Sequence, residues 1–149
     1  MLKDLLKRDV IELKVECKDW KEAIRKGTQN LIDKGFIEES YTEAIFESFK
    51  ENGPYMVIGP GIVLAHARPE DGVNQLCMSL TTLKEGINFG NKTNDPVKLI
   101  ITFGAIDNKS HLEALSQLME LFMNDNDINK IISSTTKDDV LDIIYKYSK

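Results

Sequence analysis

Two histidines are the residues best suited to chemistry in this chain, because a neutral imidazole can act as a nucleophile or a proton donor near neutral pH. His66 follows the apolar run 62–65, which predicts a buried strand. Pro69 has no N–H to donate, so the chain should leave the sheet just after His66. This places the imidazole at the end of a strand, with the rigid sheet on one side and solvent on the other. Another protein could reach it there. The alternative is a half-buried histidine without a chemical role.

The second histidine, His111, follows the motif Asp107-Asn108-Lys109-Ser110. Ser110 and Glu113 form a capping-box pattern, which predicts that His111 lies in the first turn of a helix. A helix N-terminus carries unpaired N–H groups and a partial positive charge of roughly half a unit, so it attracts an anion such as a phosphoryl group. The same field favours a neutral ring that can donate a hydrogen bond. The alternative is an ordinary surface histidine.

The elements around these histidines predict a single three-layer α/β domain over residues 1–149. Alternating or apolar runs predict strands, and capping boxes at Asp19, Ser40 and Ser110 predict helix starts. The predicted strands are 10–15, 55–58, 62–67, 75–83 and 97–106, and the predicted helices are 19–35, 40–53, 110–123, 128–133 and 137–147. This order predicts a mixed, mostly parallel sheet of about five strands with helices on both faces. Residues 97–106, the most apolar strand, should lie in its middle.

Bulk properties narrow the class of protein. The net charge of −5 over 149 residues argues against a nucleic-acid binder, which needs a basic surface, and is compatible with a basic protein partner. The mixed charges of residues 1–9 do not form a signal peptide, and no apolar run approaches the roughly 20 residues that span a bilayer. A cytoplasmic location is therefore expected. Cys17 and Cys77 lack a C-x-x-C spacing and are expected to be free thiols.

Several chemistries are disfavoured by the residues that the sequence offers. The two histidines and scattered carboxylates show no metal-ligand spacing, and there is no glycine-lysine P-loop for a nucleotide. We therefore expect neither a metal nor another cofactor. A histidine-dependent hydrolase would need a serine or cysteine nucleophile paired with a base, and no such pair is evident.

The segment around His66 resembles the phosphorylation-site signature of enzyme IIA domains of the phosphoenolpyruvate-dependent sugar phosphotransferase system, mannitol/fructose type. Pro60-Gly61-Ile62 and His66 match that signature, and Ala67-Arg68-Pro69 with Asp71-Gly72 is most similar to the ascorbate branch. Ala65 departs from the family, which usually has proline before the histidine. The resemblance covers nearly the whole chain and implies the α/β fold described above.

The resemblance also implies a role for each site residue. His66 would accept a phosphoryl group from the phosphocarrier HPr and pass it to the cysteine of an enzyme IIB, and His111 would be the second active-site histidine. Because phosphoryl transfer spreads charge over three oxygens, Arg68 and Ser110 are expected to help hold them. Lys50 falls where the mannitol branch has an arginine, but lysine cannot fork around a phosphoryl group. The alternative for Arg68 is a solvated turn residue.

The resemblance leaves the physiological role open between two classes. The first is a free-standing transport component for a carbohydrate such as ascorbate, connected to a membrane IIC channel only through enzyme IIB. The second is a regulatory protein in which phosphorylation of His66 switches protein binding. The absence of a fused DNA-binding domain favours transport. Whether the chain is a monomer or a homodimer is also left open.

Overall fold

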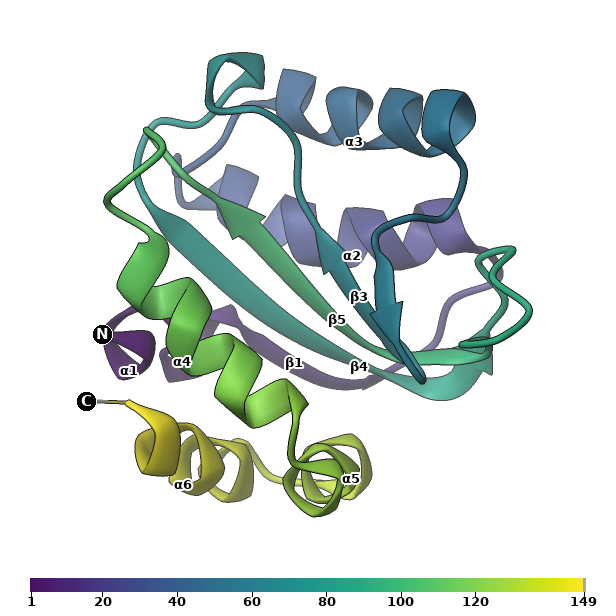
Figure 1. Cartoon of the computed structure of the whole chain (residues 1–149), viewed down its shortest axis with the longest axis vertical. Helices are drawn as coiled ribbons and strands as arrows, with labels where there is room; N and C mark the ends of the chain where they lie inside the picture. Colours follow the sequence, from purple (N-terminus) through teal and green to yellow (C-terminus); the bar gives the residue numbers. More distant parts are fainter. Residues whose placement is uncertain (149) are drawn as a thin grey trace.

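A computed structural model describes residues 1–148 and contains one five-stranded sheet with helices on both faces (Figure 1). The strands are β1 (Ile11–Val15), β2 (Val57–Gly59), β3 (Ile62–Ala65), β4 (Cys77–Ile87) and β5 (Val97–Gly104). The α-helices are α1 (Leu2–Leu5), α2 (Trp20–Asp33), α3 (Glu39–Asn52), α4 (Leu112–Phe122), α5 (Asp125–Ser133) and α6 (Lys137–Tyr147). Two 3₁₀ turns, η1 (Arg8–Val10) and η2 (Pro69–Asp71), complete the described elements.

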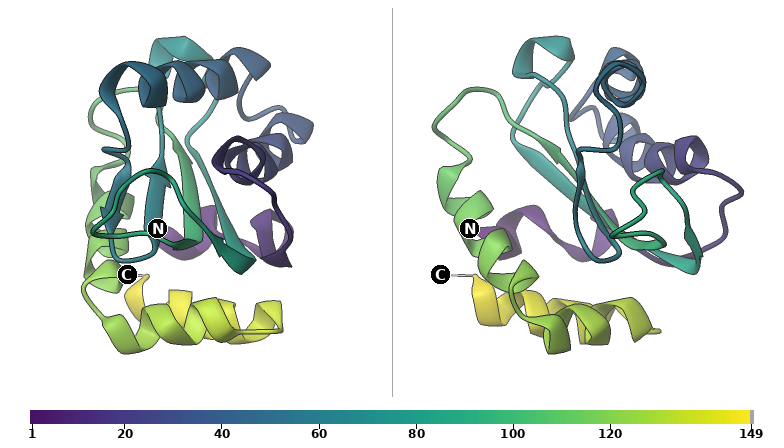
Figure 2. Two further views of the ribbon diagram at one scale, coloured as in Figure 1. Left: turned by 90° about the vertical axis from the view of Figure 1, so that its right-hand side faces the viewer. Right: turned by 45° about the vertical axis from the view of Figure 1, so that its right-hand side comes forward.

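The strands follow the order β1-β4-β5-β3-β2, which confirms the predicted mixed sheet with the 97–106 strand in its middle. β1 with β4 and β3 with β5 are parallel, whereas β4 with β5 and β2 with β3 are antiparallel. Helices α2 and α3 cover one face, and α4, α5 and α6 lie on the other (Figure 2). The predicted three-layer α/β fold is therefore confirmed. None of the helices within residues 1–148 is both long and apolar enough to cross a membrane.

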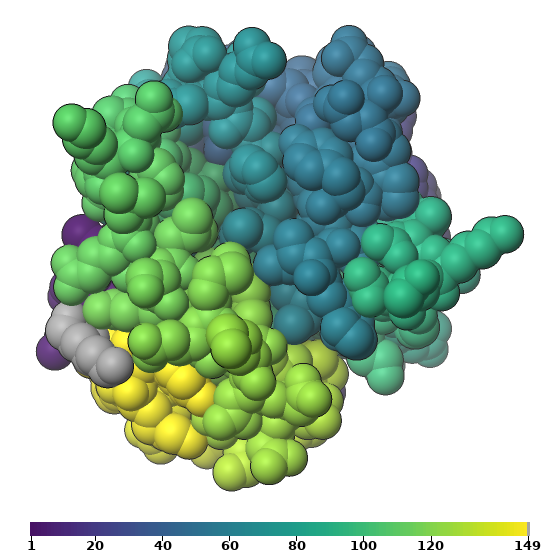
Figure 3. All heavy atoms as spheres, viewed as in Figure 1, coloured from purple at the N-terminus to yellow at the C-terminus, as the bar shows by residue number. Residues whose placement is uncertain are grey.

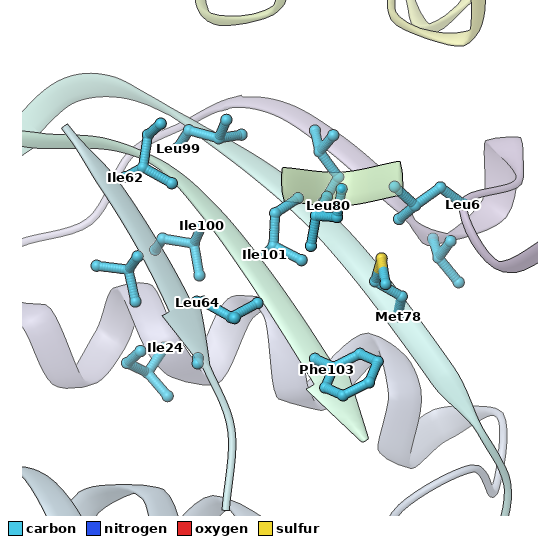
Figure 4. Packing of buried hydrophobic residues seen from close by; sticks show 14 of the residues in the cluster. Leu6, Ile24, Ile62, Leu64, Met78, Leu80, Leu99, Ile100, Ile101 and Phe103 are labelled. Carbon is cyan, nitrogen blue, oxygen red and sulfur yellow. The ribbon is translucent and has the colours of Figure 1, made fainter. Parts of the chain in front are cut away.

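The core lies on both faces of β5 because this central strand is buried along almost its whole length. Leu99, Ile100 and Ile101 are fully buried, and they pack with residues of β3 and β4 (Figure 4). β-branched side chains fit such a two-sided, pleated surface well. This core holds the C-terminal ends of β3 and β5 side by side at one edge of the sheet (Figure 1).

The helix ends show which capping predictions were right. Asp19 accepts a hydrogen bond from the Glu22 N–H at 2.8 Å, so the predicted start of α2 is confirmed. The end of α3 at Gly53 is also confirmed, because Gly53 adopts a positive φ of 73°. The Ser40 box is wrong: α3 begins at Glu39, and the Ser40 hydroxyl instead donates to the Asp71 carbonyl at 2.8 Å. A tertiary partner thus replaces the local cap.

Candidate active site

His66 lies directly after the last residue of β3, at the end of the strand as expected, although the strand stops two residues before the predicted boundary at 67. Ala65 ends the strand in register with Thr102 of β5, and η2 begins at Pro69. The Nδ1 atom of His66 is 2.8 Å from the carbonyl oxygen of Leu64, and the ring is half-buried. The end of the buried strand therefore holds one edge of the imidazole.

This contact determines which ring nitrogen can react. A backbone carbonyl can only accept a hydrogen bond, so the Nδ1 atom of His66 must carry the proton in this contact. In a neutral ring the other nitrogen, Nε2, then has the free lone pair. The local structure therefore leaves Nε2 as the ring nitrogen that is available to react, with Nδ1–H bound to the protein's own backbone.

His66 opens into a hollow of about 540 Å³ between α3 and the chain that follows β3. The face of α3 that lines this hollow carries Glu47, Ser48 and Glu51. The rings of Tyr55 and His66 meet edge-on with their centroids 6.1 Å apart, and the Tyr55 hydroxyl lies 2.9 Å from the Ser48 hydroxyl. Hydroxyl and carboxylate groups thus surround the open side of the imidazole.

The two predicted cations near His66 have different positions. Arg68 is exposed and lines the hollow together with His66. Lys50 is also exposed, but it lies off the α3 face that lines the hollow, and its Nζ is 3.4 Å from a Glu47 carboxylate oxygen. The structure therefore brings Arg68, and not Lys50, into the hollow that contains the candidate nucleophile.

His111 lies at the end of the connection that follows β5, the strand that pairs with β3. Its ring centroid is 5.5 Å from that of Phe103, the residue after Thr102. In Figure 3 the chain before α4 (green, upper left) lies beside the chain after β3 (teal, top). Both histidines therefore follow parallel neighbouring strands at the same edge of the sheet.

The predicted Ser110 capping box is wrong in the structure. Helix α4 begins at Leu112 with His111 as its N-cap, so His111 precedes the first turn rather than lying in it. Asp107 explains the difference, because its carboxylate accepts the Ser110 N–H at 2.7 Å and the Lys109 N–H at 2.8 Å. These backbone hydrogen bonds lower the pKa of Asp107. A turn stabilised by aspartate therefore precedes the helix.

Ser110 and His111 nevertheless each have a buried polar side-chain atom. The His111 Nδ1 is buried without a hydrogen-bond partner within residues 1–148, whereas the buried Ser110 hydroxyl lies close enough to the Asp107 carboxylate to help lower its pKa. Buried polar atoms without a partner are rare in folded proteins and call for an explanation such as a functional role. His111, as the N-cap of α4, is therefore the residue here that could receive an anion next to the His66 strand end.

Two tyrosines at this site carried no signal in the sequence. Tyr41 is fully buried on α3, and its hydroxyl contacts the backbone of the segment that follows β3 and of the C-terminal end of β5. Tyr55 sits in the connection between α3 and β2, beside His66. A lone tyrosine in an amphipathic helix or after a glycine-proline turn looks like an ordinary core or surface residue, so sequence reasoning missed both.

Comparison with protein families identifies relatives over nearly the whole chain. The family model for the phosphoenolpyruvate-dependent sugar phosphotransferase system, EIIA 2, matches residues 4–147. An ascorbate-specific PTS system EIIA component from Salmonella typhi is 36% identical over 141 residues, which cover 94% of this chain and 92% of that protein.

Solved structures give the same relationship. The mannitol-specific cryptic phosphotransferase enzyme IIA CmtB from Escherichia coli is 36% identical, with a TM-score of 0.88 over 97% of this chain and 98% of that one. The mannitol enzyme IIA in complex with phosphorylated enzyme IIB, also from E. coli, is 25% identical, with a TM-score of 0.82 over 95% of this chain and 99% of that one.

Proposed function

The chain belongs to the EIIA 2 family of the phosphoenolpyruvate-dependent sugar phosphotransferase system, and from that premise we propose that His66 is its phosphoryl acceptor. Members of this family are phosphotransferases that relay phosphoryl groups, and they work with enzyme IIB. The observation that carries the proposal is the hydrogen bond from His66 Nδ1–H to the Leu64 carbonyl, which leaves Nε2 free to react.

The transfer step follows from this geometry. The Nε2 lone pair of His66 forms a bond to phosphorus as the nitrogen–phosphorus bond of the donor histidine breaks. The electron pair of that bond returns to the donor ring, which leaves as a neutral imidazole if its other nitrogen carries a proton. The Leu64 carbonyl then stabilises the positive charge that develops on the His66 ring, because it accepts a hydrogen bond from the Nδ1–H group.

The phosphoryl oxygens need positive or hydrogen-bonding groups in the transition state. We propose His111 for this role, with Ser110 and the α4 N-terminus beside it, because the buried Nδ1 of His111 has no hydrogen-bond partner within the described part of the chain. Arg68 is the cation that lines the hollow, and it would add charge. Lys50 would contribute only at a distance, from outside the lining of the hollow.

We propose HPr as the donor, in a transient complex. Glu47, Glu51 and Asp71 give the hollow an acidic wall, which would favour a partner with positive charge around its own histidine. Several curated relatives named as ascorbate-specific EIIA components support ascorbate as the transported compound, with IIC reached only through enzyme IIB. Because the mannitol-specific CmtB is also 36% identical, transfer to enzyme IIB decides between the two branches. The cytoplasmic location and a homodimer stay predictions.

The first test is labelling with radioactive phosphoenolpyruvate in the presence of enzyme I and HPr from E. coli. We expect the wild-type protein to take up one acid-labile, base-stable phosphoryl group and His66→Ala to take up none. His111→Ala is the matched control, because it removes the other histidine and should still be labelled. Full labelling of His66→Ala would contradict the proposal.

The second test concerns the sugar branch. Phosphorylated wild-type protein is mixed with ascorbate-type or mannitol-type enzyme IIB, and the rate at which each acceptor gains label is compared. Faster transfer to the ascorbate type supports the proposed branch. A preference for the mannitol type would refute the branch assignment, while leaving the role of His66 intact.

A further inference from the structure

Tyr41 connects the two strand ends that carry the histidines. Its hydroxyl oxygen accepts the Ala67 N–H at 2.9 Å and donates to the Phe103 carbonyl at 2.6 Å. A hydroxyl has one proton, so the shorter contact to Phe103 is the donated bond, and the Ala67 carbonyl, at 3.4 Å, is at most a weak second acceptor. The phenol therefore bridges β5 and the segment after β3.

This bridge replaces the sheet hydrogen bonds that end with β3. Pairing between β3 and β5 stops at Ala65 and Thr102. Beyond that point the Ala67 amide needs another partner, because a backbone N–H without one is costly in a partly buried position. Tyr41 supplies it, and it does so on the residue next to His66. The hydroxyl thus fixes the backbone on the C-terminal side of the candidate nucleophile.

Tyr41 is held firmly enough to act in this way. Its side chain is fully buried, so burial raises the pKa of its hydroxyl and the proton that it donates is retained. The start of α3 is also tied to the chain after His66, through bonds from Ser40 Oγ to the Asp71 carbonyl and from the Glu38 N–H to the Gly72 carbonyl, each 2.8 Å long. Three separate hydrogen bonds therefore fasten this segment to one helix end.

We propose that Tyr41 is a positioning residue for phosphoryl transfer: its hydroxyl fixes the backbone around His66 so that the Leu64 carbonyl keeps the imidazole with Nε2 toward the donor. The same hydroxyl holds the Phe103 carbonyl, and the Phe103 ring contacts His111, so one group sets the spacing of both histidine segments. This inference rests on the proposed role of His66.

The test variant is Tyr41→Phe, which removes only the hydroxyl. Tyr147→Phe is the matched control, because it makes the same change at a hydroxyl that bonds to Asp127, between α5 and α6. Single-turnover transfer from phosphorylated HPr is measured over a range of HPr concentrations. We expect Tyr41→Phe to lower the maximal rate roughly 10- to 100-fold with little change in the half-saturating HPr concentration, since a misplaced nucleophile slows the step and not the docking. Tyr147→Phe should react at the wild-type rate.

A spectroscopic readout separates positioning from general destabilisation. The chain has only two histidines, so nitrogen-15 NMR of labelled imidazoles resolves each ring, and His111→Ala assigns them. Wild-type His66 should be protonated at Nδ1, and Tyr41→Phe should shift this ring toward a mixture of tautomers. Tyr147→Phe should leave the His66 signals unchanged. The wild-type measurement stands even where Tyr41→Phe folds poorly.

The outcomes distinguish this inference from the proposed function. If Tyr41→Phe transfers at the wild-type rate and keeps the Nδ1 proton of His66, Tyr41 does not position the nucleophile, although His66 can still be the acceptor. If the His66 ring of the wild-type protein is protonated at Nε2 instead of Nδ1, the inference is overturned as well. If wild-type protein takes no label while its tautomer is as expected, the proposed function fails, and the inference with it.

Discussion

The Nδ1 atoms of His66 and His111 differ in their hydrogen bonding, and this difference predicts different roles. His66 Nδ1 is bound to a backbone carbonyl, so the ring is oriented before any donor arrives. The Nδ1 of His111 is buried without a hydrogen-bond partner among residues 1–148, and its ring lies against Phe103. A pre-oriented ring suits a nucleophile, whereas a ring with unused hydrogen-bonding capacity suits a group that stabilises an incoming anion.

At the residue scale we therefore predict that His111→Ala separates acceptance from transfer. The variant should still take label from HPr but pass it to enzyme IIB about 10²–10³-fold more slowly, the scale expected when one pre-organised donor to the transition state is lost. The measurement is single-turnover transfer from the purified phosphoprotein. Wild-type transfer rates in His111→Ala would return this residue to the role of an ordinary N-cap histidine.

The same experiment ranks the cations. Arg68→Ala should slow transfer less than His111→Ala, because solvent and salt screen an exposed charge. Lys50→Ala is the matched cation control, since it removes a positive charge that lies outside the lining of the hollow. Equal losses in the two cation variants would indicate a general effect of net charge. A larger loss in Lys50→Ala than in Arg68→Ala would contradict the placement described above.

At the scale of elements, α2 packs closely against β5 near the strand ends that both histidines follow. Gly27 of α2 lies against Thr102, the β5 residue paired with Ala65, and a Cβ atom at Gly27 would overlap the Thr102 hydroxyl. Thr102 is fully buried, so it has little room to move. The glycine is therefore required by the packing distance and not by its backbone angles.

We predict that Gly27→Ala destabilises the protein by about 1 kcal/mol. Overpacking a core costs about 1–3 kcal/mol, and the better helix propensity of alanine offsets up to about 1 kcal/mol of that. Urea unfolding measures the change. In a Thr102→Ala background the overlap with the hydroxyl is absent, so Gly27→Ala should then be neutral or stabilising. Equal losses in both backgrounds would show that the contact with Thr102 is not the cause.

At the scale of the whole molecule, the C-terminal helices are joined through one buried carboxylate. Only 4% of the Asp127 side chain is exposed, and both of its oxygens lie 3.0 Å from the Lys146 Nζ. The Tyr147 hydroxyl also donates to it. The hydrogen bonds from Tyr147 and then Lys146 lower the pKa of Asp127 below its ordinary value of 3.8. This carboxylate connects α5 to the end of α6.

The lowered pKa predicts an acid-sensitive contribution to stability. A group whose pKa is lower in the folded state stabilises the fold above the pKa of the unfolded chain, and this contribution is lost as the pH falls through the folded-state value. The unfolding free energy of the wild-type protein should therefore fall as the pH drops below about 4. Asp127→Asn should be less stable at pH 7 and should depend less on pH in this range.

Urea unfolding at a series of pH values provides the measurement. Asp142→Asn, at an exposed position of α6, is the matched control and should keep the wild-type pH profile. An Asp127→Asn profile parallel to that of the wild type would show that Asp127 does not carry the acid sensitivity. Phosphoryl transfer at neutral pH should be unaffected in both variants, because α5 and α6 do not line the hollow at His66.

Much of this protein follows from local patterns in its sequence. The apolar run before His66 predicts β3, and the proline after it predicts that the chain leaves the sheet near His66, although β3 ends at Ala65, two residues earlier than the predicted strand. Asp19 starts α2 because its carboxylate and the N–H group that it caps are three residues apart. The Pro60–His66 signature was enough to indicate the family. Each of these depends on groups that are neighbours along the chain.

Other features were decided only by the tertiary structure. Ser40 looks like a helix cap, yet its hydroxyl is used by Asp71, 31 residues away. Lys50 was placed near the site by counting residues, but the packing of α3 turns Glu47, Ser48 and Glu51 toward His66 instead. Tyr41 reaches Ala67 and Phe103 across 26 and 62 residues. Such contacts depend on how strands pair and helices pack, because a side-chain hydroxyl bonds to whichever group the completed fold brings within about 3 Å.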